Sequence, residues 1–407
     1  MSQKLAETLT HVKRLFKNYY NSTYVSAPRS PEKREYGFSL FDSQGMIRHL
    51  SFSSSKALNE FLRKRVPKHA YYSSAYYGFP DAPVMSEKKW LGADLVFDID
   101  VDHIPTPCKI LHDVWSCMAC GRSGMGFYEK CPYCGSERIE KETWVCTICI
   151  NVAKDEVLKL ADILLSDFGV SENEMTVVFS GHRGFHLHVN NEVFKDLTQD
   201  ARREIADYVR GLGLNIDILL EKVKKSTYKF KYDITSSGWR GRLARALISI
   251  ILDIGDVKQL ENLGFSKRRA KKVLESINES KDEPLNIPLT RKEWERLIEK
   301  ALASESCVID ERVTIDTRRL IRLPGTLHGK TGLKVTKFSV GDLENKDILK
   351  ESIVFNSGYV KLRVKKFPKN VLDWKFEAVG SSVIEIPTYL GVYLVLNSSE
   401  VEVLRWI

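Results

Sequence analysis

Residues 93–100, Ala-Asp-Leu-Val-Phe-Asp-Ile-Asp, are the stretch that most constrains the fold. Their apolar side chains predict a buried β-strand that ends in acidic residues. Because residues i and i+2 of a strand point to one face, Asp98 and Asp100 should project side by side from the strand end. Two carboxylates this close repel each other unless a cation lies between them, and oxygen ligands of this kind suit Mg²⁺ or Mn²⁺. Acidic pairs at strand ends also occur without metal, where they cap a turn or meet an arginine.

A glycine-rich loop, Ser180-Gly181-His182-Arg183-Gly184, separates two further strands predicted at 175–179 and 185–189. Glycine lets backbone N–H groups approach a phosphate closely. Three side chains of this region add a hydroxyl and positive donors: Ser180, Arg183 and His186. The loop is therefore a candidate phosphate site, although a turn of this composition is also common without a ligand.

A third set of basic residues follows a predicted strand and turn: Arg322, His328 and Lys330. Cations in this arrangement are what a triphosphate requires, because charged donors make strong hydrogen bonds to phosphate oxygens. The segment just upstream, residues 308–316, offers a further carboxylate for the metal cluster.

Seven of the eight cysteines fall between residues 108 and 149, and the eighth is Cys307. Clustered CxxC pairs without a signal peptide indicate metal binding before disulfide bonds. One set has the spacing of a tetrahedral structural zinc site: Cys117, Cys120, Cys131 and Cys134. A second set flanks the first and would form either another four-ligand zinc site or a group of free buried thiols: Cys108, His112, Cys146 and Cys149.

The length of 407 residues indicates two or three domains, or one domain with large insertions. We expect a principal domain from residues 1–221 and 304–407, an inserted zinc-binding module at 105–149 and a helical insertion at 222–303. The hydrophobic pattern predicts a hairpin at 36–52, strand-like alternation over 312–340, and β structure with turns over 351–407. It predicts helices near residues 3–20, 54–65, 150–168, 200–212, 241–252, 256–263, 267–278 and 290–303.

The formal net charge is +9, and the first 90 residues hold 15 Lys and Arg against 7 Asp and Glu. A basic face of this kind suits a polyanion such as nucleic acid, or is simply a basic solvated surface. No apolar run reaches the ~18–20 residues that span a bilayer, and the N-terminal segment lacks the apolar core of a signal peptide. The sequence therefore predicts a cytoplasmic protein without membrane contact.

In their order along the chain, these motifs resemble the catalytic small subunit of archaeal and eukaryotic DNA primase, over about residues 10–340. The resemblance also includes Arg34-Glu35-Tyr36, residues 47–52 and residues 72–76. It implies an α/β fold with a mixed β-sheet core flanked by helices, together with the zinc module and the helical insertion. It also implies a nucleotidyltransferase that makes short RNA primers, and DNA primers where deoxynucleotides are accepted, on single-stranded DNA during replication.

The resemblance carries the family's metal-binding aspartates onto this chain residue by residue. Asp98 and Asp100 match two of the three, and Asp310 is the choice for the third because Val313, Arg322 and His328 follow it at the family's spacing. Asp316 is the alternative. These carboxylates would hold two Mg²⁺ or Mn²⁺ ions.

The family's nucleotide-binding residues match a second group of positions. Its phosphate loop corresponds to Ser180, Arg183 and His186, whereas His182 replaces the first arginine of the eukaryotic pattern. Its basic pair beyond the third aspartate corresponds to Arg322 and His328, with Lys330 assisting. These groups would neutralise the triphosphate of the incoming nucleotide.

The resemblance also implies structural zinc and partners. The family's single zinc site usually has a CxxC pair directly before a long helix, a position held here by Cys146 and Cys149, so the chain would hold one or two zinc ions. The expected partners are a primase large subunit, a single-stranded DNA template, a primer, and ribo- or deoxyribonucleoside triphosphates. Two alternatives stay open at this point: a zinc-ribbon nucleic-acid-binding protein whose acids are structural, and a primase-like polymerase of a repair complex or a plasmid.

Overall fold

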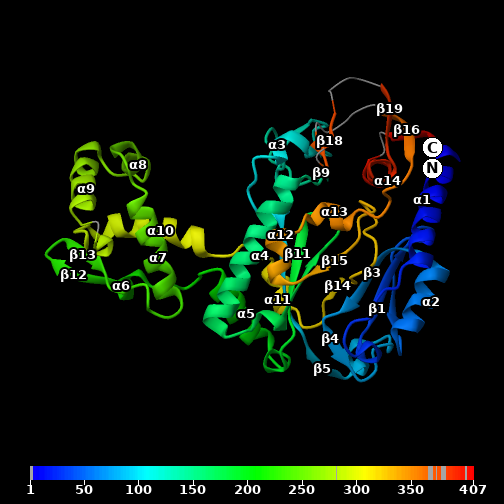
Figure 1. Ribbon diagram of the computed structural model, residues 1–407, viewed down its shortest axis with the longest axis horizontal. Coiled ribbons are helices and arrows are strands. Elements are labelled where there is room, and N and C mark those ends of the chain that lie inside the picture. Colours follow the sequence, from blue (N-terminus) through cyan, green and yellow to red (C-terminus); the bar gives the residue numbers. More distant parts are fainter. Residues whose placement is uncertain (1–2, 281, 365–369, 373, 377–381, 399–400) are drawn as a thin grey trace. The chain divides into compact units, whose positions relative to one another are not determined.

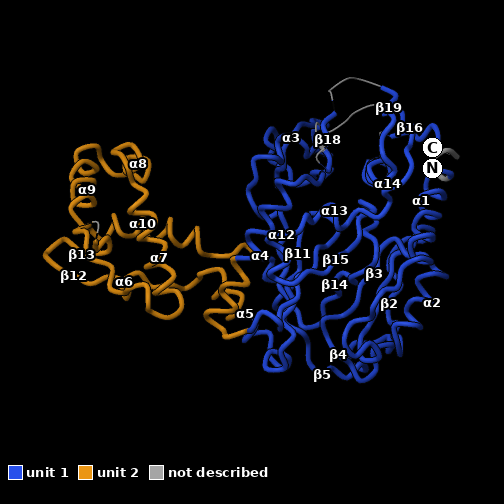
Figure 2. The backbone as a smooth tube through the Cα atoms, in the orientation of Figure 1, with its two compact units in different colours: residues 1–158, 171–203, 309–407 blue, residues 159–170, 204–308 orange. Residues whose placement is uncertain are grey.

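The computed structural model describes residues 3–280, 282–364, 370–372, 374–376, 382–398 and 401–407. The chain forms two compact units (Figure 2). Unit 1 contains Met1–Leu158, Ser171–Arg203 and Ile309–Ile407, and unit 2 contains Lys159–Val170 and Glu204–Val308. The span of unit 2 is thus wider than the helical insertion predicted at 222–303. Among the described residues, no helix is both long enough and apolar enough to cross a membrane.

The first sheet of unit 1 has the strand order β14-β3-β1-β2 and is antiparallel. Its strands are β1 (Tyr36–Leu40), β2 (Met46–Leu50), β3 (Pro67–Ser73) and β14 (Leu320–Arg322). The predicted hairpin at 36–52 is confirmed by β1 and β2. Helices α1 (Gln3–Ser22) and α2 (Ser55–Arg65) accompany this sheet (Figure 1) and place Phe16 and Leu62 in one hydrophobic cluster with Phe38. A short hairpin, β4 (Ala75–Tyr77) and β5 (Trp90–Ala93), follows β3.

The second sheet of unit 1 has the order β15-β10-β11-β6, and all of its neighbouring strands are antiparallel. Its strands are β6 (Leu95–Asp100), β10 (Met175–Phe179), β11 (Gly184–Val189) and β15 (Thr336–Phe338). The sequence predictions for β6, β10 and β11 are therefore confirmed. Leu95, Phe97 and Ile99 are fully buried, which explains why an apolar run with intervening acids forms this strand.

The cysteine-rich segment contains a short helix, a small sheet and the start of a long helix. These elements are α3 (Lys109–His112), β7 (Val114–Cys117), β8 (Ser123–Met125), β9 (Ile139–Glu142) and α4 (Thr147–Phe168). Strand β7 lies between β8 and β9. Each of Gly121 and Gly135 follows the second cysteine of a CxxC pair and has a positive φ, of 72° and 71°, which L side chains rarely adopt.

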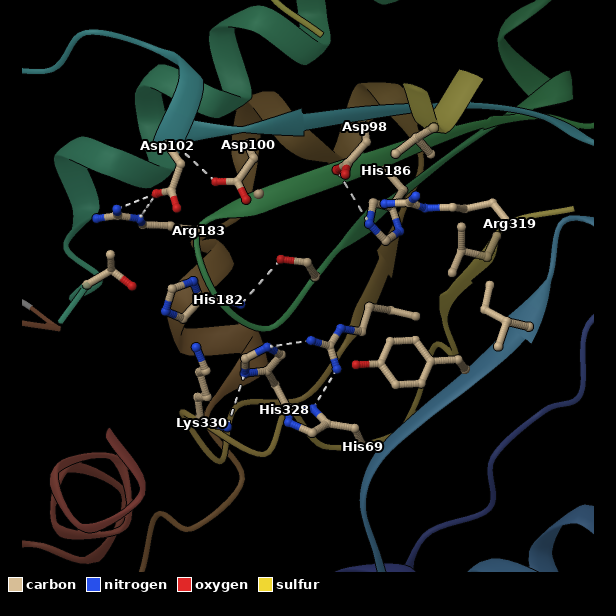
Figure 3. A pocket seen from close by; sticks show the side chains of 18 residues that line it. His69, Asp98, Asp100, Asp102, His182, Arg183, His186, Arg319, His328 and Lys330 are labelled. Carbon is tan, nitrogen blue, oxygen red and sulfur yellow. Dashed lines mark hydrogen bonds and ion pairs between the residues drawn. The ribbon is translucent and has the colours of Figure 1, made fainter. Parts of the chain in front are cut away.

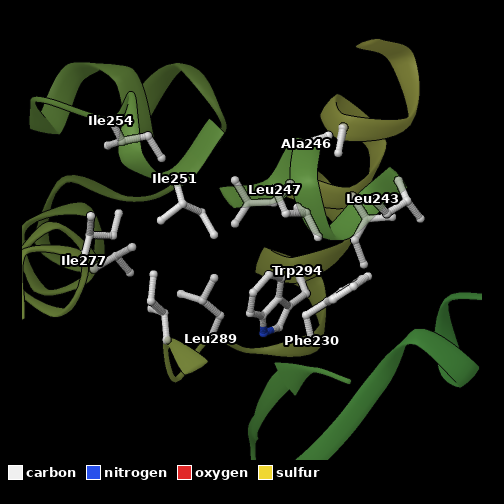
Figure 4. Close-up of a cluster of buried hydrophobic side chains, with 14 of the residues drawn as sticks. Phe230, Leu243, Ala246, Leu247, Ile251, Ile254, Ile277, Leu289 and Trp294 are labelled. Atoms are coloured by element: carbon white, nitrogen blue, oxygen red, sulfur yellow. The ribbon is translucent and has the colours of Figure 1, made fainter. Parts of the chain in front are cut away.

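Unit 2 is mainly helical and has its own hydrophobic core (Figure 4). Its elements include α6 (Ile216–Leu219), β12 (Leu220–Lys224), β13 (Thr227–Phe230), α7 (Trp239–Leu252), α8 (Val257–Asn262), α9 (Lys267–Glu279) and α10 (Arg291–Glu305), while α5 (Gln199–Val209) begins in unit 1. The core gathers around Trp294, whose Nε1 donates to the Tyr228 carbonyl at 2.8 Å. The four predicted helices are confirmed, but the hairpin β12–β13 was not predicted.

The C-terminal part of unit 1 differs from the sequence prediction in two places. Residues 312–340 were expected to be strand-like, yet α11 (Glu311–Ile315) is a helix whose Asp310 side chain accepts a hydrogen bond from the Arg312 amide at 3.1 Å. The tail was expected to be β structure, yet α14 (Thr388–Asn397) is a helix that is buried over most of its length. A helix buried on all sides shows no amphipathic period, and its Val, Leu and Tyr content also favours strands, so the pattern was misleading.

The rest of the tail is largely β structure, as predicted. Strands β16 (Tyr359–Val364), β19 (Ser382–Pro387) and β20 (Val401–Trp406) form an antiparallel sheet with β16 in the centre. Two short strands, β17 (Asn370–Val371) and β18 (Trp374–Lys375), and two helices, α12 (Val340–Asn345) and α13 (Ile348–Ser352), complete the described strands and α-helices. Part of the predicted tail lies outside the described residues.

Candidate active site and metal centres

The register between β6 and β11 brings the acidic strand end beside the glycine-rich loop. Asp98 is opposite His186 and Asp100 is opposite Gly184, so all four positions share one face of the sheet. Figure 3 shows Asp98 and His186 pointing toward each other, with 3.5 Å between Oδ1 and Nε2. Gly184 is required here, because a Cβ would lie 2.7 Å from the Ile99 carbonyl oxygen.

The third predicted acid, Asp310, joins this group from a segment that is distant in sequence. Its amide donates to the Asp98 carbonyl at 2.8 Å. Burial, and next the negative charge of Asp310, raise the pKa of Asp98 to about 6. Asp316 instead ends α11 and accepts a hydrogen bond from the Arg318 amide at 2.9 Å. The geometry thus favours Asp310 over Asp316 as the partner of Asp98.

The negative charge of the acidic group is only partly offset by its cationic neighbours. Burial and the charge of Asp102 raise the pKa of Asp100 to about 6. Burial, followed by Arg322 and Arg319, lowers the pKa of His186 to about 4, so this imidazole is neutral near pH 7 and cannot compensate Asp98. Three oxygen-bearing side chains in such a setting have the donor chemistry of a divalent cation site.

Arg322 lies on β14 and is surrounded by aromatic and imidazole rings. Its guanidinium donates to His69 Nδ1 at 2.5 Å and to His328 Nε2 at 2.9 Å, and its Cζ lies 4.6 Å from the centre of the Tyr71 ring. Within the described part of the chain, Arg322 forms no salt bridge with a carboxylate. Because its partners are neutral, the half-buried guanidinium of Arg322 keeps its charge available for an anionic ligand.

Three histidines around Arg322 are neutral because burial, and next the nearby cations, lower their pKa values. The pKa of His69 falls to about 2 and that of His182 to about 3, while that of His328 lies well below its usual value. The rings of His182 and His328 are stacked, with centres 5.4 Å apart. His182 Nε2 and His186 Nδ1 are buried and have no hydrogen-bond partner among the described residues. Cations without a paired carboxylate, together with imidazole nitrogens without a hydrogen-bond partner, indicate a binding site for a polyanion.

His69 is a functional candidate that the sequence interpretation missed. It lies on β3 two residues before Tyr71, so both side chains reach the same face. Arg322 is the direct partner of Tyr71 in the β14–β3 pairing. The alternating pattern of residues 67–73 could have predicted strand β3. The sequence could not show that His69 lies beside Arg322, because that depends on the pairing of β3 with β14.

A single cavity of about 490 Å³ unites most of these groups (Figure 3). Its lining includes Asp98, Asp100, Ser180, His182, His186, Arg322, His328 and Lys330, together with Asp102, Arg183 and His69. Asp310 is not among the residues that line this cavity, although its amide is hydrogen-bonded to the Asp98 carbonyl. The cavity thus has an acidic side and a basic side, and its volume falls within the usual range for small-molecule sites.

Arg183 does not join the other predicted phosphate donors through its side chain. The guanidinium is fully buried and donates to the carboxylates of Asp102 and Asp113 and to the Trp144 carbonyl. In Figure 3 it extends toward Asp102, away from His328 and Lys330. The ion pairs of Arg183 with Asp102 and Asp113 could not be predicted from the sequence, because Asp113 belongs to the cysteine-rich segment, 70 residues away along the chain.

The cysteines form two separate four-residue clusters. The ribbon cluster contains Cys117, Cys120, Cys131 and Cys134, and the helix cluster contains Cys108, His112, Cys146 and Cys149. In each cluster the four donor atoms lie within 4.8 Å of one another. All eight cysteines belong to the described residues, and none of them forms a disulfide. Cys307 is in neither cluster.

The donor sets fit zinc. His112 Nδ1 lies 2.7 Å from the Asp113 carboxylate, which leaves Nε2 facing the Cys146 and Cys149 sulfurs at 3.5 and 3.4 Å. A ligating histidine that donates its other ring nitrogen to a carboxylate is the usual arrangement around protein-bound zinc. Four protein donors in each cluster indicate structural sites without an open position. The second cluster is therefore a candidate zinc site rather than a group of isolated thiols.

An acidic cluster on one sheet that faces basic residues of a neighbouring sheet across one cavity is an arrangement suited to a nucleotidyltransferase. The family model for the DNA primase small subunit matches residues 97–339. The chain belongs to the DNA primase small subunit family, and it is a primase catalytic subunit with nucleotidyltransferase activity. This decides against the alternative of a zinc-ribbon protein without catalysis.

Several curated relatives are similar over nearly their whole length. The DNA primase small subunit PriS of Methanococcoides burtonii is 33% identical, over 97% of this chain and 98% of the relative. PriS of Methanothrix thermoacetophila is 33% identical, over 96% and 97%. PriS of Nitrosopumilus maritimus is 30% identical, over 93% and 95%. The similarity therefore includes both the cysteine-rich segment and the tail.

Proposed function

We propose that Asp98, Asp100 and Asp310 hold two Mg²⁺ or Mn²⁺ ions and that the chain makes short primers on single-stranded DNA by two-metal nucleotidyl transfer. The observation that carries this proposal is the single cavity with half-buried acids on one side and Arg322 on the other. When bound, the ions would lower the pKa of the primer 3′-hydroxyl and stabilise the leaving pyrophosphate. The 3′-oxygen forms a bond to the α-phosphorus while the bond to pyrophosphate breaks.

The basic side of the cavity binds the triphosphate in this proposal. Arg322 donates to phosphate oxygens from a position held by His69, His328 and Tyr71. Ser180, His186 and Lys330 supply the remaining donors from the same cavity. The buried imidazoles become better bases when the phosphates bring negative charge, since positive neighbours contribute to their lowered pKa values.

Both cysteine clusters bind zinc in this proposal, and the zinc is structural. The partner is a primase large subunit, as the name of the small-subunit relatives implies, and the pair acts on single-stranded DNA in the cytoplasm at the replication machinery. The basic excess of the first 90 residues would hold the template or the primer–template duplex. Ribonucleotides and deoxyribonucleotides are both candidate substrates.

A nucleotide incorporation assay tests the proposed function. Labelled ATP or dATP is supplied on a poly-dT template with an annealed primer and Mg²⁺ or Mn²⁺, and the wild-type chain is compared with Asp98→Ala and Asp100→Ala. We expect incorporation by the wild type only, with template binding retained in both variants. Near wild-type rates in the variants would remove these acids from the mechanism.

A further inference from the structure

Asp113 is a buried carboxylate with partners on two functional sides. On one side it bonds His112 Nδ1 at 2.7 Å, in the helix cluster. On the other side it accepts from Arg183 Nη1 at 2.9 and 2.8 Å, in the active-site loop. The Trp144 amide also donates to it at 3.1 Å. Its side chain is only 1% exposed, so these partners, rather than water, satisfy the charge.

The contacts continue from Arg183 to the catalytic acids. Arg183 Nε donates to Asp102 Oδ1 at 2.7 Å, and Nη2 forms a second bond to the same oxygen. The Asp102 amide in turn donates to Asp100 Oδ1 at 2.9 Å. An unbroken set of bonds therefore leads from the helix cluster to a carboxylate that faces the cavity.

The arrangement argues against Arg183 as a phosphate ligand. Its side chain is fully buried, and Nε, Nη1 and Nη2 all donate to protein oxygens. To reach a nucleotide, the guanidinium would have to leave Asp113, and an unpaired charge at a 1% exposed position is strongly unfavourable. We therefore interpret Arg183 as a residue that holds the glycine-rich loop against Asp102 and Asp113, not as a residue that binds phosphate.

We propose that Asp113 and Arg183 are positioning residues that couple the helix cluster to the catalytic acids, which rests on the proposed function. Asp113 orients His112 as a zinc ligand and at the same time fixes Arg183, which fixes Asp102 and the Asp100 side chain. Zinc in the helix cluster and the divalent ion at the acids then favour each other's binding, because such coupling is reciprocal.

The test uses the full-length, zinc-loaded chain with the variants Asp113→Asn and Arg183→Gln. Zinc release is followed by competition with a chromophoric chelator, Mn²⁺ affinity by electron paramagnetic resonance, and nucleotide kcat and KM on poly-dT. We expect Asp113→Asn to weaken one of the two zinc sites by ~10–100-fold and to leave the ribbon cluster unchanged. Both variants should weaken Mn²⁺ binding and lower kcat, while the nucleotide KM changes little.

Asp94→Asn is the matched control, because it breaks another buried pair of the same unit, Arg34 with Asp94 at 2.6 Å. It should lower thermal stability without changing Mn²⁺ affinity or zinc release. If Asp113→Asn does not fold, Arg183→Lys carries the test, because it keeps the charge but loses the fork of donors to Asp102 and Asp113.

Two results would overturn the coupling. A nucleotide KM that rises at least about tenfold in Arg183→Gln, with unchanged Mn²⁺ affinity, would make Arg183 a phosphate ligand. Variants that lose only thermal stability, like Asp94→Asn, would make the contacts merely structural. The proposed function fails separately: Asp98→Asn would then bind Mn²⁺ as tightly as the wild type.

Discussion

Arg322 shows how a single cation can be kept ready for a substrate. Its neighbours are two neutral imidazoles and a tyrosine ring, so it is oriented without being neutralised. The pKa of Arg322 is lowered by burial, which reflects the cost of keeping the charge away from water. A bound phosphate would offset that cost, and the interaction should therefore be strong.

We expect Arg322→Ala to raise the KM for nucleoside triphosphate at least about tenfold while template affinity stays within about twofold. Losing a charge-assisted contact costs roughly 1.5–3 kcal/mol, or about 10- to 150-fold in affinity. Arg318→Ala is the control, because Arg318 is exposed and does not line the cavity. KM, template Kd and Tm are measured on one preparation. A loss of Tm without a change in KM would instead make Arg322 structural.

The buried acids predict a particular pH dependence. Their raised pKa values of about 6 mean that the metal-free folded protein gains stability from protonation. This contribution is fully present below the unfolded pKa of about 4 and is lost as pH rises through about 6. A divalent ion replaces the protons, so Mn²⁺ should raise Tm strongly at about pH 7.5 and weakly at about pH 5. Differential scanning fluorimetry measures this, and Asp98→Asn should reduce the effect; an equal shift at both pH values would speak against the acids as ligands.

At the scale of elements, the two clusters are built around different secondary structure. In the ribbon cluster, Cys117 ends β7 and the other three cysteines lie in loops and turns, whereas the helix cluster combines the region of α3 with the start of α4. Such small elements have little hydrophobic core of their own, since only Trp115, Cys117 and Cys131 are buried together in the ribbon. Metal is expected to supply much of their stability.

Metal analysis of the purified chain should therefore find about two zinc ions. Cys120→Ser should reduce the content to about one, because it removes one ligand of the ribbon cluster alone. Cys307→Ser is the control and should keep both ions, since Cys307 belongs to neither cluster. A zinc content near one in the wild type would reject the two-site interpretation.

The elements also explain which predictions from the sequence succeeded. Helices α7 and α10 have an apolar stripe at helical spacing, and β6 is a short apolar run that ends in acids, so these elements were recognised. Helix α14 has no polar face that contrasts with its apolar face, and the strands β12 and β13 carry several lysines. None of these three elements was therefore predicted. Most of the site was predictable because its acids and cations stand in short motifs. The bonds of Arg183 to Asp113 were not, because they depend on tertiary folding of the zinc module.

At the scale of the whole molecule, the small-subunit family implies a division of labour with a partner. The cavity described above serves extension of a primer, which needs one nucleotide and one primer end. Starting a primer needs two nucleotides held together, and the large subunit is proposed to help with that step.

We therefore expect the isolated chain to extend an annealed primer readily but to initiate poorly on poly-dT without one. Addition of the large subunit should raise the initiation rate much more than the extension rate. Product lengths are resolved by gel electrophoresis, and a chain with Asp98→Ala controls for contaminating polymerase. Efficient initiation by the isolated chain, unaltered by the partner, would contradict this prediction.

The strand order of unit 1 has a consequence for how the protein is made. Strand β3 pairs with β14, and β10 pairs with β15, yet both partners follow unit 2 in the chain. During synthesis, β3 and β10 therefore leave the ribosome with one edge open, and they stay so while more than one hundred residues of the inserted unit are translated. Open strand edges are templates for wrong pairing, so nascent chains that pause within residues 204–308 should be the species most dependent on chaperones.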